Sequence, residues 1–298
     1  MSIKVRRIFS FQETRFRDFA ARYLAYSETN KAPATYRRHD LNNMRPLTAF
    51  FGGMKLRAVT PVLVEKYKRE RLACVAPATV NRELATLRHM YTKAAEWGYV
   101  RVHPLKGVTQ LKEPPGRVRY LREEEIGRLL GCCAAHVLPI VVAALHTGMR
   151  KGELLGLRWE RVDLERRRIT VLHSKNNEVR SVPVNRTLYG VLEELGRKGR
   201  SGHVFRGPDG KALGDIKKGF AGAVRRAGIE DFRFHDLRHT FASYMVMSGV
   251  DLRTVQQVLG HTELKTTLRY SHLSTRHVQE SVEKLDGVMG RRGDGVME

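Results

Sequence analysis

The chain has 298 residues, 42% of them hydrophobic, and this length predicts two compact domains rather than one. Its 54 Lys and Arg residues against 31 Asp and Glu residues give a formal net charge of +23. Because solubility alone needs a net charge of only about 2–8, this excess favours a polyanionic partner, most often a nucleic acid.

The composition also argues against a membrane protein and against a disulfide-rich secreted protein. The longest apolar run covers residues 138–145, whereas a membrane-spanning helix needs roughly 20 residues. The N-terminal stretch MSIKVRRIFSFQETRF lacks a long apolar signal region, so we expect a cytoplasmic protein with no membrane partner. Cys74, Cys132 and Cys133 are too few and too badly spaced for a disulfide framework or a zinc cluster.

The N-terminal third of the chain has the hydrophobic spacing of helices. Residues 79–98 predict a helix that begins at a capping residue, Thr79, and ends at Gly98. Its apolar residues recur at the spacing of one helix face: Val80, Leu84, Leu87 and Tyr91. Arg82 and Lys93 fall on the opposite face. Given the net charge, we expect part of this basic surface to lie against DNA.

The composition changes at residues 112–119, KEPPGRVR, where two prolines and a glycine cannot continue a helix. We predict a domain linker there. The expected organisation is a helical domain over 1–111, the linker, a second domain over 120–275, and a C-terminal segment over 276–298.

The second domain has a mixed pattern that predicts an α+β fold, mainly helical with a small sheet or hairpins. Residues 139–148 predict a buried helix, with Pro139 at its first position and Gly148 as its stop. Further helices are expected over residues 121–133, 215–228, 235–249, 251–260 and 263–273.

Two hairpins are expected between these helices. Residues 167–184 predict two strands joined by a turn at Asn176 and Asn177, which places Lys175 at the lip of the hairpin. Residues 203–213 predict a second, short hairpin.

The stretch RFHDLRHTFAS, residues 233–243, places His235 and His239 one helical turn apart with Asp236 beside the first. Such a pair resembles half of a zinc-hydrolase site. Two features argue against a metal. A third ligand and a general base are needed, and the acid here is Asp236, which is shorter than the usual glutamate. The guanidinium of Arg238 on nearly the same face would also repel a cation. The site is therefore expected to hold no metal.

A phosphate fits the same stretch better. His235 and Arg238 are helix neighbours at i and i+3, and arginine presents a planar donor fork that matches two phosphate oxygens. The pair also lies at the expected start of a helix, where backbone N–H groups favour an anion.

Other segments offer groups that would complete such a site. Arg150 follows the expected end of the buried helix, and Glu153 comes three residues later. A second arginine on a rigid support is what the charge of a pentavalent phosphate needs. His261 follows a glycine, and Tyr270 lies nine residues further on. Each alone would be ordinary packing, but the set is not.

These segments resemble the tyrosine recombinase (phage integrase) family. The matching pieces are TGMRKGEL, HSKNNEVRSVP, HDLRHTFAS, LGH and TLRYSHL, which occur in the family's order within residues 120–275. The helical N-terminal part resembles the family's core-binding (SAM-like) domain less sharply. No extra arm-binding domain is expected before it.

The resemblance implies DNA phosphoryl transfer through a 3′-phosphotyrosyl intermediate. Tyr270 would attack the scissile phosphate and His235 would accept its proton. Arg150 and Arg238 would clamp the non-bridging oxygens, and His261 would donate a further hydrogen bond to them. No cofactor is implied, because the ester bond conserves the energy needed for rejoining.

Two further residues have implied roles, and two lose the role that the metal interpretation gave them. Lys175 would protonate the departing 5′ oxygen, and Glu153 would orient its neighbours rather than react. His239 is expected to pack or to support the site, and Asp236 to cap or orient the helix start.

The implied function is site-specific recombination that integrates or excises a mobile element, such as a viral genome. Alternatives are Xer-like chromosome dimer resolution, strand passage like that of a type IB topoisomerase, and a catalytically silent DNA-binding protein. The implied partners are double-stranded DNA with specific recombination sites, a homotetramer that exchanges residues 276–298 between protomers, and a directionality factor. The two domains would close around the duplex as a clamp.

Overall fold

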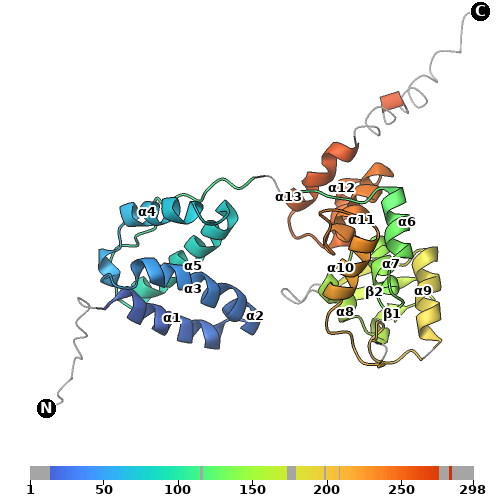
Figure 1. Ribbon diagram of the computed structural model, residues 1–298, viewed down its shortest axis with the longest axis horizontal. Coiled ribbons are helices and arrows are strands. Elements are labelled where there is room, and N and C mark those ends of the chain that lie inside the picture. Colours follow the sequence, from blue (N-terminus) through green and yellow to red (C-terminus); the bar gives the residue numbers. More distant parts are fainter. Residues whose placement is uncertain are drawn as a thin grey trace, which may run out of the picture. The chain divides into compact units, whose positions relative to one another are not determined.

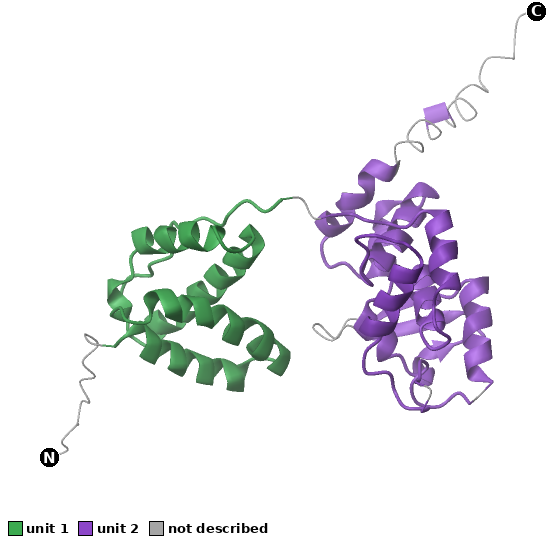
Figure 2. Cartoon of the chain, viewed as in Figure 1, with its two compact units in different colours: residues 1–115 green, residues 116–298 purple. Residues whose placement is uncertain are grey.

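The chain forms two compact units, residues 1–115 (unit 1) and 116–298 (unit 2), each with its own hydrophobic core (Figures 1 and 2). The structure is a computed structural model that describes residues 14–114, 117–172, 179–197, 199–207, 209–274 and 282–283. The division falls within the stretch that the sequence predicts as a linker. None of the helices in these residues combines the length and apolar character that crossing a membrane requires.

Unit 1 is helical throughout its described part, as its hydrophobic spacing predicts (Figure 1). Its elements are α1 (Phe16–Asn30), α2 (Pro33–Thr35), the π-helical turn η1 (Tyr36–Asp40), α3 (Leu41–Phe51), the 3-10 turn η2 (Leu56–Ala58), α4 (Pro61–Leu72) and α5 (Pro77–Glu96). They pack around aromatic rings such as Phe16, Phe51, Tyr67 and Tyr91.

Helix α5 confirms the predicted buried face and corrects the predicted start. The expected face is fully buried: Val80, Leu84, Leu87 and Tyr91. The helix begins two residues before Thr79, because Pro77 takes the first helical position and its fixed φ suits a helix start. Gly98, with φ of 78°, follows the helix end.

Unit 2 combines helices with one small sheet, which is the predicted α+β class. Its longer helices are α6 (Glu123–Gly131), α7 (Leu138–Thr147), α8 (Lys151–Leu155), α9 (Arg186–Gly196), α10 (Lys217–Arg226), α11 (Asp236–Met247) and α12 (Leu252–Leu259). The short turns are η3 (Trp159–Arg161), α13 (Leu264–Thr267) and the 3-10 segment η4 (Leu268–Ser274). Helix α9 is absent from the sequence prediction.

The sheet contains the predicted hairpin strands and one more. Strands β2 (Arg168–Leu172) and β3 (Val179–Pro183) pair antiparallel, with Val171 opposite Arg180, and the short β1 (Val162–Asp163) extends the sheet. The predicted turn and Lys175 lie outside the described residues.

The second predicted hairpin is present only as a single antiparallel bridge. Over the described part of residues 203–213, the backbone forms isolated bridges, Arg206 with Ala212 and His203 with Arg158, and no ladder. Glycines at both ends of the loop region supply turns, and too few residues alternate in hydrophobicity to specify strand pairing.

The buried helix α7 ends at Gly148 as predicted, although it begins one residue before Pro139. Gly148 takes a left-handed conformation with φ of 61°. A Cβ atom there would lie 2.5 Å from Phe241 Cδ1 and 2.6 Å from Leu259 Cδ2. Only glycine therefore fits this turn, which directs the chain into Arg150 and α8.

Candidate active site

The structure brings the predicted site residues that it describes together in unit 2. Their positions are Arg150 just before α8, Glu153 within α8, His235 and Arg238 at the start of α11, His261 after α12, and Tyr270 within η4. Lys175, the remaining predicted residue, lies outside the described residues.

Arg150 is fixed at the N-terminus of α8 by Glu153. One carboxylate oxygen of Glu153 accepts the backbone N–H of Arg150 at 2.8 Å, and the other accepts Nη1 of the same residue at 3.1 Å. The Arg150 side chain is 38% exposed, so its guanidinium also faces solvent. This geometry agrees with an orienting role for Glu153 and leaves Arg150 able to meet an anion.

Arg238 is buried, with 3% of its surface exposed. Its Nη1 donates to the carbonyl of Gly148 at 2.7 Å and its Nη2 donates to the carbonyl of Leu259 at 2.8 Å. The guanidinium thus joins the end of α7 to the end of α12. Burial and the nearby charges of Arg150 and Arg180 lower the pKa of Arg238 to about 9, so the group stays charged at neutral pH.

Tyr270 is almost fully buried, and its hydroxyl contacts His239. The hydroxyl lies 2.5 Å from His239 Nδ1, and the ring packs in a cluster with Val246, Val255 and Leu259. His239, predicted to pack or to support the site, thus has its ring against the predicted nucleophile.

The protonation of this pair is set by burial. Burial raises the pKa of Tyr270 to about 12, and burial followed by the neighbouring His235 lowers the pKa of His239 to about 4. At neutral pH the proton therefore stays on the tyrosine oxygen and the imidazole stays neutral. The contact is therefore one between a neutral phenol and a neutral imidazole.

His235 and His261 both lie near Arg238 and Arg150. His235 is exposed at the start of α11, and its partly covered ring and the nearby Arg238 lower its pKa. His261 is half-buried, with Nδ1 2.9 Å from Thr267 Oγ1. Burial and then Arg238 and Arg150 lower the pKa of His261 to about 3, so it is a neutral donor or acceptor.

Asp236 stabilises the start of α11 through hydrogen bonds. Its Oδ2 accepts the backbone N–H of Arg233 at 2.8 Å and Nη2 of Arg117 at 2.6 Å. The Asp236 carboxylate is thus bound by two donors of the protein, the backbone of Arg233 and the side chain of Arg117. Within the described ranges, no three His, Cys, Asp or Glu side chains gather as a metal site would require.

The structure adds one residue that the sequence did not single out. Arg180 on β3 makes a bidentate ion pair with Glu153, at 3.0 and 2.6 Å. No local sequence pattern marks an arginine in a strand as a site residue. Arg180 is identified only because the fold brings it close to Glu153. Burial raises the pKa of Glu153, but the hydrogen bonds and charges of Arg180 and Arg150 together outweigh it, so the pKa falls to about 2.

The comparisons with known proteins agree with this geometry. The profile of the phage integrase family matches residues 119–277. The chain belongs to this family. Among its relatives, the integrase of Salmonella phage P22 is 32% identical over 231 residues, 72% of this chain and 59% of that protein. The chain thus spans less than two thirds of P22 integrase.

Another phage integrase family relative covers a larger share of its own length. The tyrosine recombinase XerC of Lactobacillus leichmannii is 30% identical over 222 residues, 68% of this chain and 75% of that protein. A lambda integrase tetramer bound to a Holliday junction has a TM-score of 0.73 at 16% identity, over 86% of this chain and 80% of that one. This likeness confirms the fold predicted from the sequence, mainly helical with a small sheet.

Proposed function

We propose that the chain is a site-specific DNA recombinase that breaks and rejoins DNA through a covalent link to Tyr270. The observation that supports the proposal is that Arg150, Arg238, His235 and His261 lie near one another, with Arg238 also near Tyr270, in a member of the phage integrase family. Two guanidiniums suit the charge that spreads over the oxygens of a phosphoryl transition state.

The reaction conserves the phosphodiester energy. The Tyr270 oxygen attacks the scissile phosphorus, a 3′-phosphotyrosyl ester forms, and the bond from phosphorus to the 5′ oxygen breaks. His235 accepts the phenol proton, and Lys175 delivers a proton to the departing 5′ oxygen. Rejoining reverses these steps, with the 5′-hydroxyl as nucleophile and the phenolate as leaving group. No nucleotide or metal cofactor takes part.

Attack requires the tyrosine to leave its resting position. Because Tyr270 is 1% exposed and its hydroxyl contacts His239, η4 must move before the oxygen can reach a phosphate. His235 lies at the exposed end of α11, where a duplex can approach, which favours it over His239 as the proton acceptor.

The partner is double-stranded DNA that carries specific recombination sites, met in the cytoplasm. Unit 1 would act as the core-binding domain and unit 2 as the catalytic domain, which close around the duplex as a clamp. The net charge of +23 supports the salt-sensitive contacts to phosphates. A homotetramer on two sites, with residues 276–298 exchanged between protomers and a directionality factor, is the proposed assembly.

Integration or excision of a mobile element is the favoured biological role, since phage P22 integrase is among the relatives. The similarity to XerC supports chromosome dimer resolution as the second candidate.

A covalent capture experiment tests the proposal. The protein is mixed in EDTA with nicked suicide duplexes whose core sequence is randomised, and SDS-resistant adducts are isolated and sequenced. We expect an adduct through Tyr270 that is lost in Tyr270→Phe and kept in Tyr244→Phe, a change to another tyrosine of unit 2. An adduct that persists in Tyr270→Phe, or that forms only with added zinc, would contradict the proposal.

A further inference from the structure

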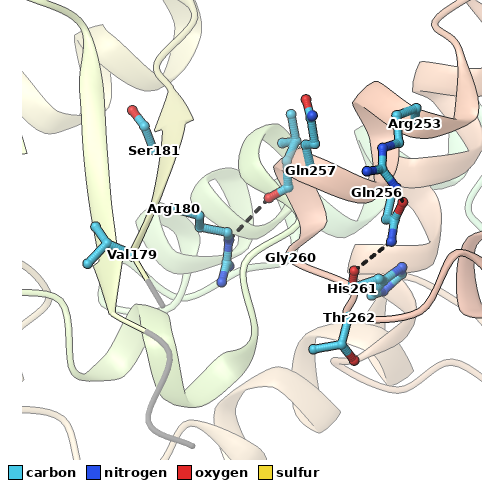
Figure 3. Close-up of a pocket in the computed structure, with 10 residues that line it drawn as sticks. Val179, Arg180, Ser181, Arg253, Gln256, Gln257, Gly260, His261 and Thr262 are labelled. Carbon is cyan, nitrogen blue, oxygen red and sulfur yellow. Dashed lines mark hydrogen bonds between the residues drawn. The ribbon is translucent and has the colours of Figure 1, made fainter. Parts of the chain in front are cut away.

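Arg180 has no part in the chemistry proposed above, yet its side chain contacts the site. It comes from strand β3, whereas Arg150 lies at the start of α8 and Arg238 in α11. Figure 3 shows the Arg180 side chain directed at the end of α12. Nε donates to the carbonyl of Val258 at 3.2 Å, and the two Nη atoms bind Glu153. Only 11% of the Arg180 side chain is exposed, so its position is well defined by contacts with the protein.

Three arginines bind three successive carbonyls at the C-terminal end of α12. Arg180 binds the carbonyl of Val258 at 3.2 Å, Arg238 that of Leu259 at 2.8 Å, and Arg150 that of Gly260 at 3.4 Å. This end of a helix has unsatisfied carbonyls and carries the negative end of the helix dipole, which attracts cations. The turn before His261 therefore contacts all three guanidiniums through its successive carbonyls.

The space around Gly260 is matched to Arg180. Gly260 has φ of 66°, and a Cβ atom added there would lie 2.9 Å from Cδ of Arg180 and 3.0 Å from its Nη1. Glycine is thus required both by the left-handed turn and by the close passage of the Arg180 side chain.

Glu153 is shared between Arg180 and Arg150, and the sharing is unequal. Arg180 binds both carboxylate oxygens, whereas the Arg150 side chain is 3.1 Å from one of them. If Arg180 were removed, the carboxylate would be left with Arg150 as its cation among the described residues. A fork-to-fork pair between them would then occupy donors of Arg150 that a phosphate needs.

We propose, on the basis of the function proposed above, that Arg180 is a positioning residue that holds Glu153 away from a full ion pair with Arg150. In doing so it keeps the Arg150 guanidinium available to the scissile phosphate. It also ties β3, the N-terminus of α8 and the end of α12 into one arrangement. Arg180 acts through Glu153 and does not itself touch the reacting atoms.

The test measures single-turnover cleavage and DNA binding separately. The substrate is one nicked duplex recovered from the covalent capture experiment, and the variants are Arg180→Met, Glu153→Gln and the double variant. We expect Arg180→Met to cleave roughly 100-fold more slowly, the effect of a group displaced by about 1 Å. Its dissociation constant for the duplex should stay within about threefold, because few phosphate contacts are lost.

The double variant distinguishes positioning through Glu153 from a purely structural role, because a purely structural role predicts no recovery of the rate. A neutral glutamine cannot hold Arg150 as a carboxylate does, so Arg180→Met with Glu153→Gln should recover at least roughly tenfold of the lost rate. Arg168→Met is the matched control. Arg168 lies on the neighbouring strand β2 with its side chain 44% exposed and pairs with Asp163 at 3.8 Å, so the rate should change by less than about twofold.

Several results would overturn the inference. Arg180→Met that cleaves like the unchanged protein would show that Arg180 does not position Arg150. If Arg180→Met binds the duplex more weakly, and the slope of the logarithm of the binding constant against the logarithm of the salt concentration becomes shallower by about 1, Arg180 is a phosphate contact instead. A double variant no faster than Arg180→Met would exclude the route through Glu153.

Two further results are kept distinct. If the unchanged protein forms no adduct on any duplex, the proposed function fails, whatever Arg180 does. If Arg180→Met does not fold, Arg180→Lys decides the matter, since lysine keeps the charge but cannot bind both carboxylate oxygens as a fork. Its rate should fall at least roughly tenfold and be recovered by Glu153→Gln, and an unchanged rate would overturn the inference.

Discussion

Unit 1 and unit 2 both bury charged side chains, but they compensate them differently. In unit 1 the carboxylate of Glu83, 3% exposed, binds Arg71 at 2.6 Å and the hydroxyl of Tyr67 at 2.6 Å. Asp40, 5% exposed, likewise pairs with Lys31 at 2.7 Å. Each buried carboxylate has its own cation, as expected where charges serve the fold.

In unit 2 three guanidiniums lie near one largely buried carboxylate, that of Glu153, and only two of them bind it. Arg150 and Arg180 both bind Glu153, and Arg238 binds backbone carbonyls instead. Burial, then repulsion from Arg150 and Arg180, holds the pKa of Arg238 at about 9, well below its ordinary value. The comparison teaches that the buried carboxylates of unit 1 are each paired with a cation, whereas the candidate site of unit 2 gathers more guanidiniums than carboxylates, an excess of charge that a phosphate would neutralise.

The largest expected effect is on the cleavage rate, when a positive charge is removed from the candidate site of unit 2. Arg238→Ala removes a charge from the proposed phosphate site, so single-turnover cleavage should fall on the order of 10³-fold or more. The change also leaves the carbonyls of Gly148 and Leu259 without this donor, so the rate is measured on the folded fraction. Arg238→Lys should recover only part of the rate, and a variant within tenfold of the unchanged protein would contradict the assignment.

The matched change in unit 1 should affect stability instead. Arg71→Ala leaves Glu83 buried without its cation, so the free energy of unfolding of unit 1 should fall by about 3 kcal/mol. The chain has two tryptophans, Trp97 in unit 1 and Trp159 in unit 2, so unit 1 unfolding can be followed by fluorescence in a Trp159→Phe background.

The catalytic rate of folded Arg71→Ala should match that of the unchanged protein at saturating DNA. A large loss of rate with little loss of stability would show that the two units do not divide their charges as described. Loss of both together would place Arg71 at the DNA.

Sequence reasoning predicted the fold class and singled out most of the side chains that lie in the candidate site. Arg150, His235, Arg238 and His261 each follow a local signal, a glycine turn or a helix start, whereas Tyr270 is predicted from its place after His261 and from the family resemblance. Local signals of this kind depend on a few neighbouring residues, which is why they can be read from the chain. Whether each residue acts as proposed stays a prediction.

Two contacts that the sequence did not predict are nonlocal. His239 meets Tyr270 across 31 residues and Arg180 meets Glu153 across 27, and neither spacing has a periodic signature. Helix α9, absent from the sequence prediction, nevertheless has local signals: the side chain of Asn185 caps its start, and Leu188 and Leu192 are buried on one face. Tertiary contacts, not local propensity, set the contacts of His239 and Arg180.

The smallest expected effect concerns acid. Of the described histidines with a lowered pKa, His89 belongs to unit 1, and four belong to unit 2: His146, His235, His239 and His261. A histidine whose pKa is lower folded than unfolded binds more protons when unfolded, so it stabilises the fold above about pH 6.5 and loses that contribution as pH falls. Unit 2 should therefore lose stability first on acidification.

For His239, buried and with a pKa of about 4, the loss should approach about 1 kcal/mol per pH unit between pH 6.5 and 4. Glu153, with a pKa of about 2, adds a loss only below its unfolded pKa of roughly 4.3, so the two windows are separable. Urea unfolding followed by Trp159 in a Trp97→Phe background measures the slope, and His239→Gln should flatten it. A slope that His239→Gln leaves unchanged would mean that the ring is not held neutral beside Tyr270, and the predicted nucleophile would then lack the buried contact that keeps it protonated.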